Sequence, residues 1–155
     1  SLVAKRQLDL LESQVKDAAE KGAKIIIGGK SPAGLMGAFY EPTILTNITK
    51  DMRVWTEEVF GGPVLPIVSF KTEEEAIELA NDTPYGLGSR VYSKDIDRAK
   101  RVASKIEAGT VEINHGSRWL PCNPFGGFKS SGMGREHGIV GLRELCQIKV
   151  ISMGK

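Results

Sequence analysis

The sequence predicts an α/β protein in which helices flank a mainly parallel sheet. Between residues 64 and 114, apolar runs of strand length alternate with stretches whose apolar residues recur at helical spacing, which gives two consecutive strand-helix-strand units. The 18 glycines gather in connections, as in a sheet protein with short tight turns. At 155 residues the chain can bury one core of ordinary size, so a single domain is expected.

The first part of the chain predicts one helix and two strands. Residues 3–21 carry apolar side chains at helical spacing with charged ones between them, which predicts an amphipathic helix ending at Gly22. Residues 23–27 are rich in β-branched side chains and predict a short strand. Residues 39–45 are predicted to form an edge strand, because Pro42 has no N–H to donate to a neighbouring strand.

A buried strand is predicted over residues 64–70, and a helix follows it. Thr72 and Glu75 have the spacing of a capping box, in which each side chain bonds a free N–H of the first turn. The helix is expected to stop at the sequence Asn-Asp-Thr-Pro that begins at residue 81.

The second strand-helix-strand unit covers residues 86–114. A strand over residues 86–93 ends at Ser93, which is expected to cap a helix with apolar positions between residues 96 and 106. Gly109 ends this helix, and the alternating residues 110–114 form the next strand.

The last part of the chain reads as a long glycine-rich loop, a short helix and a strand. The loop is predicted over residues 115–136, the helix over residues 139–145 and the strand over residues 147–153. Two stretches of the chain are similar to phosphate-binding motifs, but neither fits its motif. Gly29-Lys30-Ser31 lacks the earlier glycine of a P-loop, and the glycines from Gly132 to Gly138 have the wrong spacing for a dinucleotide fingerprint.

Composition excludes several classes of function. The net charge of +2 is the balance of 21 basic and 19 acidic residues spread along the chain, so no nucleic-acid partner is expected. No apolar run approaches the length that spans a bilayer, and no signal-type segment is present, so a cytoplasmic protein without membrane contact is expected. Cys122 and Cys146 stand alone, with no metal-ligand spacing, and buried thiols without a metal are predicted.

An acidic turn precedes the strand at residue 64. Glu58 and Phe60 lie in the sequence Thr-Glu-Glu-Val-Phe-Gly-Gly-Pro, which starts at residue 56. A carboxylate can accept hydrogen bonds from sugar hydroxyls and an aromatic ring can cover a flat heterocycle, so the pair would suit a nucleotide. The alternative is an ordinary exposed acidic turn followed by a core phenylalanine.

A second stretch extends this interpretation. Residues 124–136 read Pro-Phe-Gly-Gly-Phe-Lys-Ser-Ser-Gly-Met-Gly-Arg-Glu, and residues 81–87 read Asn-Asp-Thr-Pro-Tyr-Gly-Leu. Together with the acidic turn, they make the sequence resemble the aldehyde dehydrogenase superfamily over essentially its whole length. The resemblance implies the C-terminal third of a subunit, with residues 1–145 in the catalytic domain and residues 146–155 forming an oligomerisation strand.

The resemblance assigns roles to residues on both sides of the reaction. It implies that Glu58 contacts the nicotinamide ribose and Phe60 the nicotinamide ring of NAD or NADP. The family usually has one glycine before the proline, whereas two occur here, at Gly61 and Gly62.

On the substrate side, the resemblance places Trp119 and Phe125 where aromatic residues line the aldehyde tunnel, with packing under a long loop as the alternative for Trp119. Arg118 would pair with the carboxylate of a semialdehyde, or else be a surface arginine. Glu136 matches a signature whose carboxylate assists proton relay, or else it forms a structural salt bridge.

The resemblance implies an oxidoreductase that oxidises an aldehyde to a carboxylic acid through a cysteine thiohemiacetal and a thioester. The family's nucleophilic cysteine, general base and oxyanion amide would precede the residue matching Ser1, so the 155-residue chain alone is expected to be inactive. Two alternatives stay open: a non-catalytic assembly module, and a related reductase of acyl phosphates or acyl-CoA. The aldehyde and the choice between NAD and NADP are not predicted.

The predicted last strand is where a partner subunit is expected to bind. In the family, the matching strand joins a small sheet that packs on a neighbouring subunit, so the resemblance implies a homo-oligomer. Apolar side chains on both faces of residues 147–153 agree with a strand that is covered by another segment.

Overall fold

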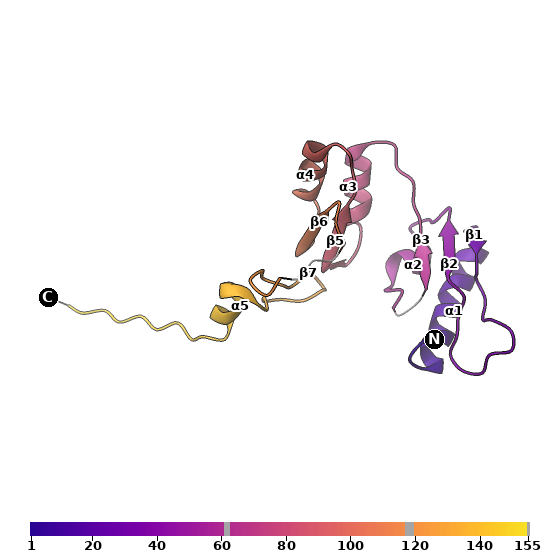
Figure 1. Ribbon diagram of the computed structural model, residues 1–155, viewed down its shortest axis with the longest axis horizontal. Coiled ribbons are helices and arrows are strands. Elements are labelled where there is room, and N and C mark those ends of the chain that lie inside the picture. The colour runs from indigo at the N-terminus through magenta and orange to yellow at the C-terminus, as the bar shows by residue number, and fades with distance from the viewer. Residues whose placement is uncertain (61–62, 117–119, 155) are drawn as a thin grey trace. The chain divides into compact units, whose positions relative to one another are not determined.

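The structure, a computed structural model, describes residues 1–60, 63–116 and 120–154. The chain divides into two compact units, Ser1–Phe70 and Lys71–Lys155. Each unit has its own helices and strands (Figure 1).

The first unit packs one long helix against a three-stranded sheet. Helix α1 spans Lys5–Glu20, and the sheet contains β1 (Lys24–Ile27), β2 (Thr43–Thr46) and β3 (Val64–Pro66) in the order β1-β2-β3. Strands β1 and β2 are antiparallel, whereas β2 and β3 are parallel. A one-turn helix, α2 (Arg53–Thr56), connects the sheet to the acidic turn.

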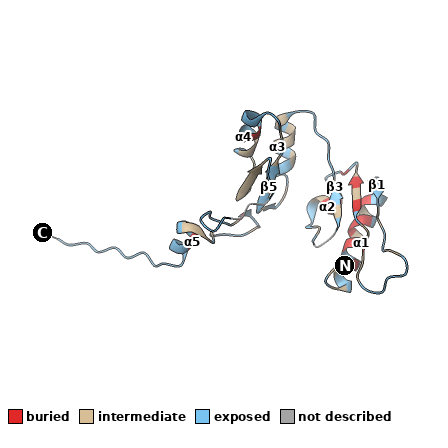
Figure 2. Ribbon diagram, viewed as in Figure 1, coloured by how far each residue is buried: buried red, intermediate tan, exposed pale blue. Residues whose placement is uncertain are grey.

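The core of this unit is the apolar stripe of α1. The stripe meets β2 and the residues that follow it, and Figure 2 shows that the buried residues gather on these elements. Gly22 has a φ of +99°, a conformation that glycine adopts at low cost, and it lets the chain leave α1 for β1 as expected. The buried apolar residues of the cluster are Leu8, Leu11, Val15, Ala18, Tyr40, Leu45, Ile48, Met52 and Val54.

Two strand predictions in this unit are wrong. Strand β2 is the central strand and not an edge, because Pro42 lies just before its first residue and every N–H of the strand remains available. Strand β3 is short and half exposed instead of buried. Leu65 pairs with Ile44, and paired residues point to the same face, so Leu65 lies on the face opposite Leu45, which packs in the α1 core.

The second unit contains α3 (Glu73–Asn81), β4 (Tyr85–Gly86), β5 (Gly88–Val91), α4 (Ile96–Ala103), β6 (Thr110–Ile113), β7 (Phe128–Lys129) and α5 (Gly138–Glu144). Strands β5 and β6 are parallel, as two strands joined by a helix should be, and β4 pairs antiparallel with β7. Three small sheets therefore replace the one mainly parallel sheet that was expected, although helices and parallel pairs keep the α/β class.

The first turns of α3 and α4 show which of the predicted capping residues are correct. Thr72 Oγ1 accepts a hydrogen bond from the N–H of Glu75 at 3.2 Å, and the Glu75 carboxylate accepts one from the N–H of Lys71 at 2.7 Å, so a capping box is present. The prediction for Ser93 is wrong. Asp95 caps α4 by accepting from the N–H of Arg98 at 2.9 Å, while Ser93 Oγ bonds the N–H of Asp95.

The predicted last strand is absent from the described residues. Positions 146–154 have no assigned helix or strand, and they continue beyond α5 as an extended segment (Figure 1). Their large apolar side chains are 79% to 97% exposed. A strand needs a neighbour to pair with, and the described part of this chain supplies none here.

Leu45 provides a test of the first unit's core. Leu45 is fully buried, whereas Leu65 in the neighbouring strand is 57% exposed. Leu45→Ala should lower the free energy of unfolding by about 2–5 kcal/mol, because it removes apolar contacts and leaves a cavity. Urea unfolding followed by Trp55 fluorescence, in a Trp119→Phe background, measures this change.

The matched control is Leu65→Ala, the same substitution in the same sheet. It should shift the free energy of unfolding by less than about 1 kcal/mol. Equal losses for the two variants would contradict the assignment of the core to the α1 side of the sheet.

Candidate functional site

The acidic turn presents its two predicted site residues to solvent. Glu58 is exposed, and within the described residues its carboxylate has no hydrogen bond or ion pair. Phe60 is 59% exposed, so the alternative of a core phenylalanine does not hold in this chain. The backbone of the turn is therefore fixed by contacts other than the packing of these two side chains.

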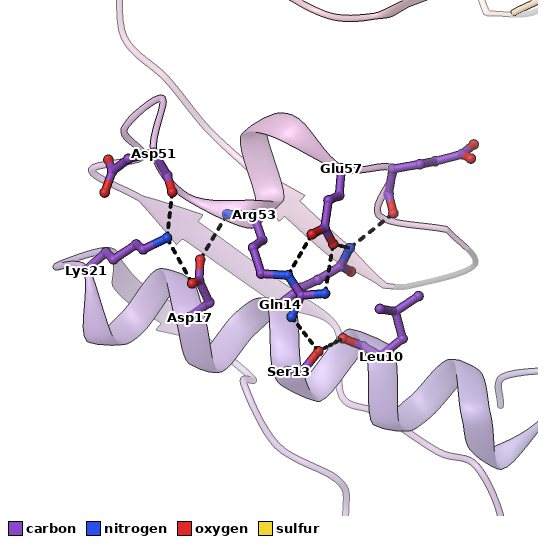
Figure 3. Close-up of polar contacts among 9 residues, drawn as sticks. Leu10, Ser13, Gln14, Asp17, Lys21, Asp51, Arg53 and Glu57 are labelled. Atoms are coloured by element: carbon purple, nitrogen blue, oxygen red, sulfur yellow. Dashed lines mark hydrogen bonds and ion pairs between the residues drawn. The ribbon is translucent and has the colours of Figure 1, made fainter. Parts of the chain in front are cut away.

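Those contacts come from α1 and α2, as Figure 3 shows. The side-chain amide of Gln14 donates to Glu57 Oε2 at 3.1 Å and to the carbonyl oxygen of Glu58 at 3.2 Å. Arg53 holds the same Glu57 carboxylate from the other side with two bonds of 2.7 and 2.9 Å. Its third nitrogen, Nη1, donates to Ser13 Oγ on α1 at 2.9 Å.

Asp17 fixes the start of α2. Its Oδ2 accepts a hydrogen bond from the N–H of Arg53, the first residue of α2, at 2.9 Å, and its Oδ1 lies 2.9 Å from Lys21 Nζ. Lys21 also donates to the carbonyl oxygen of Asp51. Met52, the residue in the capping position of α2, has no side-chain cap, so Asp17, which lies 36 residues before Arg53, performs that function.

The same contacts lower two carboxyl pKa values. The hydrogen bond from the Arg53 N–H, followed by that from Lys21, holds the pKa of Asp17 below its ordinary value. The Arg53 guanidinium, followed by the Gln14 amide, lowers the pKa of Glu57. Both carboxyl groups are therefore bound most strongly in their ionised form.

In the second unit, the structure brings Phe125 and Glu136 together. Their backbones form an isolated antiparallel bridge, with N–H to oxygen distances of 2.8 and 2.7 Å. The Glu136 side chain is 76% exposed and lies 3.7 Å from His137 Nε2. An exposed contact of this length stabilises the fold little, so the structural salt bridge is a weak account of Glu136.

Close backbone contacts shape the loop that carries Phe125. A Cβ added to Gly109 would lie 1.7 Å from the carbonyl oxygen of Gly126, and one added to Gly126 would lie 2.5 Å from that of Gly134. No side chain fits at either position. Gly109 and Gly126 therefore allow this backbone packing.

Phe125 lines a cavity of about 600 Å³ in the second unit. One wall is formed by β5 and β6, and the other by the residues that lead to Phe125. Arg118 and Trp119, the other two predicted substrate residues, lie outside the described residues. The lining residues are Leu87, Gly88, Ser89, Arg90, Thr110, Glu112, Leu120, Asn123, Pro124 and Phe125.

The two cysteines differ from expectation. Cys122 and Cys146 are both exposed, because the loop before Phe125 and the end of α5 have few neighbours. Across residues 1–60, 63–116 and 120–154, no cluster of three or more His, Cys, Asp or Glu side chains could hold a metal ion. In the same ranges, no helix is both long and apolar enough to cross a membrane.

The sequence did contain a signal for Gln14 that was missed. Leu11, Val15 and Ala18 define the apolar stripe of α1, and Gln14 falls on this stripe at the same spacing. It is only 1% exposed. A polar residue inside an apolar stripe must find a hydrogen-bond partner, although the sequence does not say where that partner lies.

Helices packed on strands, with parallel pairs in both units, define this chain as an α/β protein. A model of the aldehyde dehydrogenase family matches residues 1–151. The chain belongs to the aldehyde dehydrogenase family.

Over the aligned residues, curated relatives are nearly half identical to this chain. Betaine aldehyde dehydrogenase of Bacillus subtilis is 49% identical over 142 residues, which is 90% of this chain and 29% of the relative. The NADP⁺ succinate-semialdehyde dehydrogenase of Deinococcus radiodurans is 46% identical over 141 residues, 91% of this chain and 29% of the relative. The chain thus spans about three tenths of the length of these enzymes.

Solved structures of aldehyde dehydrogenases are also similar to this chain. Betaine aldehyde dehydrogenase of Staphylococcus aureus in complex with NAD⁺ matches with a TM-score of 0.86 and 46% identity, over 92% of this chain and 28% of that one. An aldehyde dehydrogenase of Mycobacterium tuberculosis complexed with NAD⁺ gives 0.87 and 38%, over 93% and 30%. NAD⁺ and NADP⁺, the cofactors of these relatives, are the two that the sequence predicted.

The lowered pKa of Asp17 predicts a pH dependence of stability. Because the folded pKa lies below the ordinary value of 3.8, the stabilisation is complete above that pH and is lost as the pH falls through the folded pKa. Asp17→Asn should therefore be less stable than the wild-type chain at pH 6. The two should converge towards pH 2, where the carboxyl group is neutral in the folded and unfolded states.

Urea midpoints at a series of pH values, followed by Trp55 fluorescence in the Trp119→Phe background, measure this difference. A constant offset between Asp17→Asn and wild type from pH 6 to pH 2 would show that the ionised form of Asp17 is not the stabilising one.

Proposed function

We propose that this chain is the C-terminal part of an NAD(P)-dependent aldehyde dehydrogenase subunit, in which Glu58 and Phe60 hold the nicotinamide end of the cofactor. The observation that carries the proposal is the acidic turn. An exposed carboxylate that has no partner among the described residues lies two residues before an exposed aromatic ring, on a backbone that α1 holds in place.

The two side chains fit the cofactor chemically. The Glu58 carboxylate offers several acceptor sites for the paired hydroxyls of a ribose, and it has no competing partner among the described residues. The exposed ring of Phe60 can cover one face of a flat nicotinamide and exclude water from it. When bound, NAD(P)⁺ supplies the hydride acceptor for oxidation of an aldehyde, while the protein binds and orients it.

On the substrate side, the proposal assigns Phe125, Trp119 and Arg118 to the aldehyde and Glu136 to proton transfer. Phe125 lines the 600 Å³ cavity, and its backbone bridge to Glu136 places both residues at one end of the glycine-rich loop. Glu136 is exposed and can exchange protons with water. The oxidation through a cysteine thioester, and the inactivity of the 155 residues by themselves, stay predictions.

The proposal also includes assembly through residues 146–155. Four of the apolar side chains in this segment, Ile148, Val150, Ile151 and Met153, are exposed by 97%, 85%, 79% and 91%. An extended apolar segment with free backbone groups pairs readily with the edge of another sheet. A second subunit is the proposed source of that edge, which gives a homo-oligomer.

Glu58→Gln in the full-length enzyme tests the cofactor role. The change keeps the shape but removes the charge, so binding of NAD(P)⁺ and the rate of hydride transfer should fall about tenfold, the loss expected for a hydrogen bond to an ionised group. Stopped-flow absorbance of NAD(P)H formation measures the rate, and fluorescence titration measures the affinity.

Glu20→Gln serves as the control, because Glu20 is an exposed carboxylate at the end of α1. It should leave both quantities unchanged. Wild-type affinity and rate in Glu58→Gln would refute the cofactor role of Glu58.

Removal of residues 146–155 tests the assembly. The truncated enzyme should sediment as a smaller species than the full-length enzyme, because the exposed apolar segment no longer pairs with its partner. A variant of equal length, with Ser in place of Ile148, Val150, Ile151 and Met153, should behave like the truncation. An unchanged sedimentation coefficient after correction for mass would rule the segment out.

A further inference from the structure

Gln14 is a buried polar side chain in a helix stripe that otherwise packs the core. It is 1% exposed, and Thr43 is the other buried polar residue in the part of the chain that the structure describes. Burying an amide is unfavourable unless its hydrogen bonds are made. Gln14 is therefore kept in place by specific partners, and these partners indicate its role.

The side-chain nitrogen of Gln14 forms two hydrogen bonds to the acidic turn (Figure 3). A side-chain amide has two donor hydrogens. Bonds from Nε2 to Glu57 Oε2 at 3.1 Å and to the Glu58 carbonyl oxygen at 3.2 Å use both. Neither partner belongs to the sheet or to α2. The amide thus serves the two residues on either side of the Glu57–Glu58 peptide bond.

The bond to the Glu58 carbonyl fixes the direction of the turn. Among the described residues, the Gln14 amide is the one hydrogen-bond partner of the backbone between residues 58 and 60. The carbonyl of Glu58 belongs to the peptide that leads to Val59, so holding it restricts the rotation that aims the Glu58 side chain and the chain towards Phe60. Without it, the packing of Val59 against the core would be left to hold that stretch.

A closed ring of bonds makes this contact rigid. Arg53 donates two hydrogen bonds to the Glu57 carboxylate and one to Ser13, the neighbour of Gln14 in α1. Ser13 Oγ in turn donates to the carbonyl oxygen of Leu10. Glu57 is therefore held from α1 and from α2 at once, and the lowered pKa of its carboxyl group has the same two causes.

We propose that Gln14 is a positioning residue for cofactor binding, whose amide hydrogens hold Glu57 and the Glu58 carbonyl and so aim Glu58 and Phe60 at the nicotinamide end of NAD(P)⁺. The inference rests on the function proposed for Glu58 and Phe60. Gln14 itself does not touch the cofactor and acts through the turn.

Gln14→Met in the full-length enzyme tests the inference. Methionine fills a similar volume and favours a helix, but it has no hydrogen to donate. The KM for NAD(P)⁺ should rise, and single-turnover hydride transfer should slow, each by about threefold to tenfold, the loss expected for one or two hydrogen bonds. Unchanged KM and hydride transfer would overturn the inference.

A double mutant separates positioning from a general effect. If Gln14 acts through Glu58, Gln14→Met should change the KM for NAD(P)⁺ by less than about twofold in a Glu58→Gln background, because neighbouring sites are not additive when one acts through the other. An equal effect in both backgrounds would overturn the inference. If Glu58→Gln is itself silent, the proposed function fails and the inference fails with it. If Glu58→Gln is impaired and Gln14→Met is not, the inference alone fails.

Val15→Ala is the control for loss of stability. Val15 is buried beside Gln14 in α1 and makes no bond to the turn, so its truncation weakens the same core. It should lower the melting temperature but keep the wild-type KM for NAD(P)⁺. A KM defect in Val15→Ala as large as that in Gln14→Met would show that the role of Gln14 is structural.

If Gln14→Met does not fold, Gln14→Asn provides the second variant. Asparagine keeps an amide in the helix but is shorter by one methylene, so it cannot span to both acceptors. The same rise in the KM for NAD(P)⁺ is expected, and a wild-type KM would overturn the inference.

Discussion

The hydrogen bonds that pass from one face of α1 to residues 51–58 are the constraint on which the site in the first unit depends. Gln14, Asp17 and Lys21 each reach a group in this segment, and Arg53 returns the contact to Ser13. Without them, α2 would be a single turn with no cap, too short to persist by its own hydrogen bonds. The sheet brings residues 51–58 close to α1, and the hydrogen bonds from α1 fix their conformation.

Predictions succeeded where the deciding contacts are close in sequence. Thr72 and Glu75 are three residues apart, and their spacing is sufficient to predict the start of α3. The cap of α4 is also a local contact, but only Ser93 was predicted to form it. Both Ser93 and Asp95 can cap a helix, and only the backbone shows that Asp95 precedes the first helical turn. The strand expected over residues 147–153 stays a prediction, since a strand forms only when a second strand pairs with it and the described residues of this chain supply none.

The candidate site shows the same division. The resemblance predicted that Glu58 and Phe60 contact the cofactor, which stays a prediction, and the structure places both side chains in solvent. Gln14 lies more than 40 residues away from the groups it bonds, so no local pattern connects them.

The second unit adds a contrast. Ala99 is its single buried apolar side chain among the described residues, and the chain spans about three tenths of the length of its relatives.

The remote cap on α2 also orders the events of folding. The bond from the Arg53 N–H to Asp17 closes a loop of 36 residues, and a loop of that length costs chain entropy before any contact repays it. α1 can form early because its bonds are local, whereas α2 gains its cap only after β1 and β2 have brought residue 53 back to α1. The acidic turn is thus among the last parts of this unit to take shape, and a polypeptide halted before that step would hold α1 and the paired strands β1 and β2 without an ordered acidic turn.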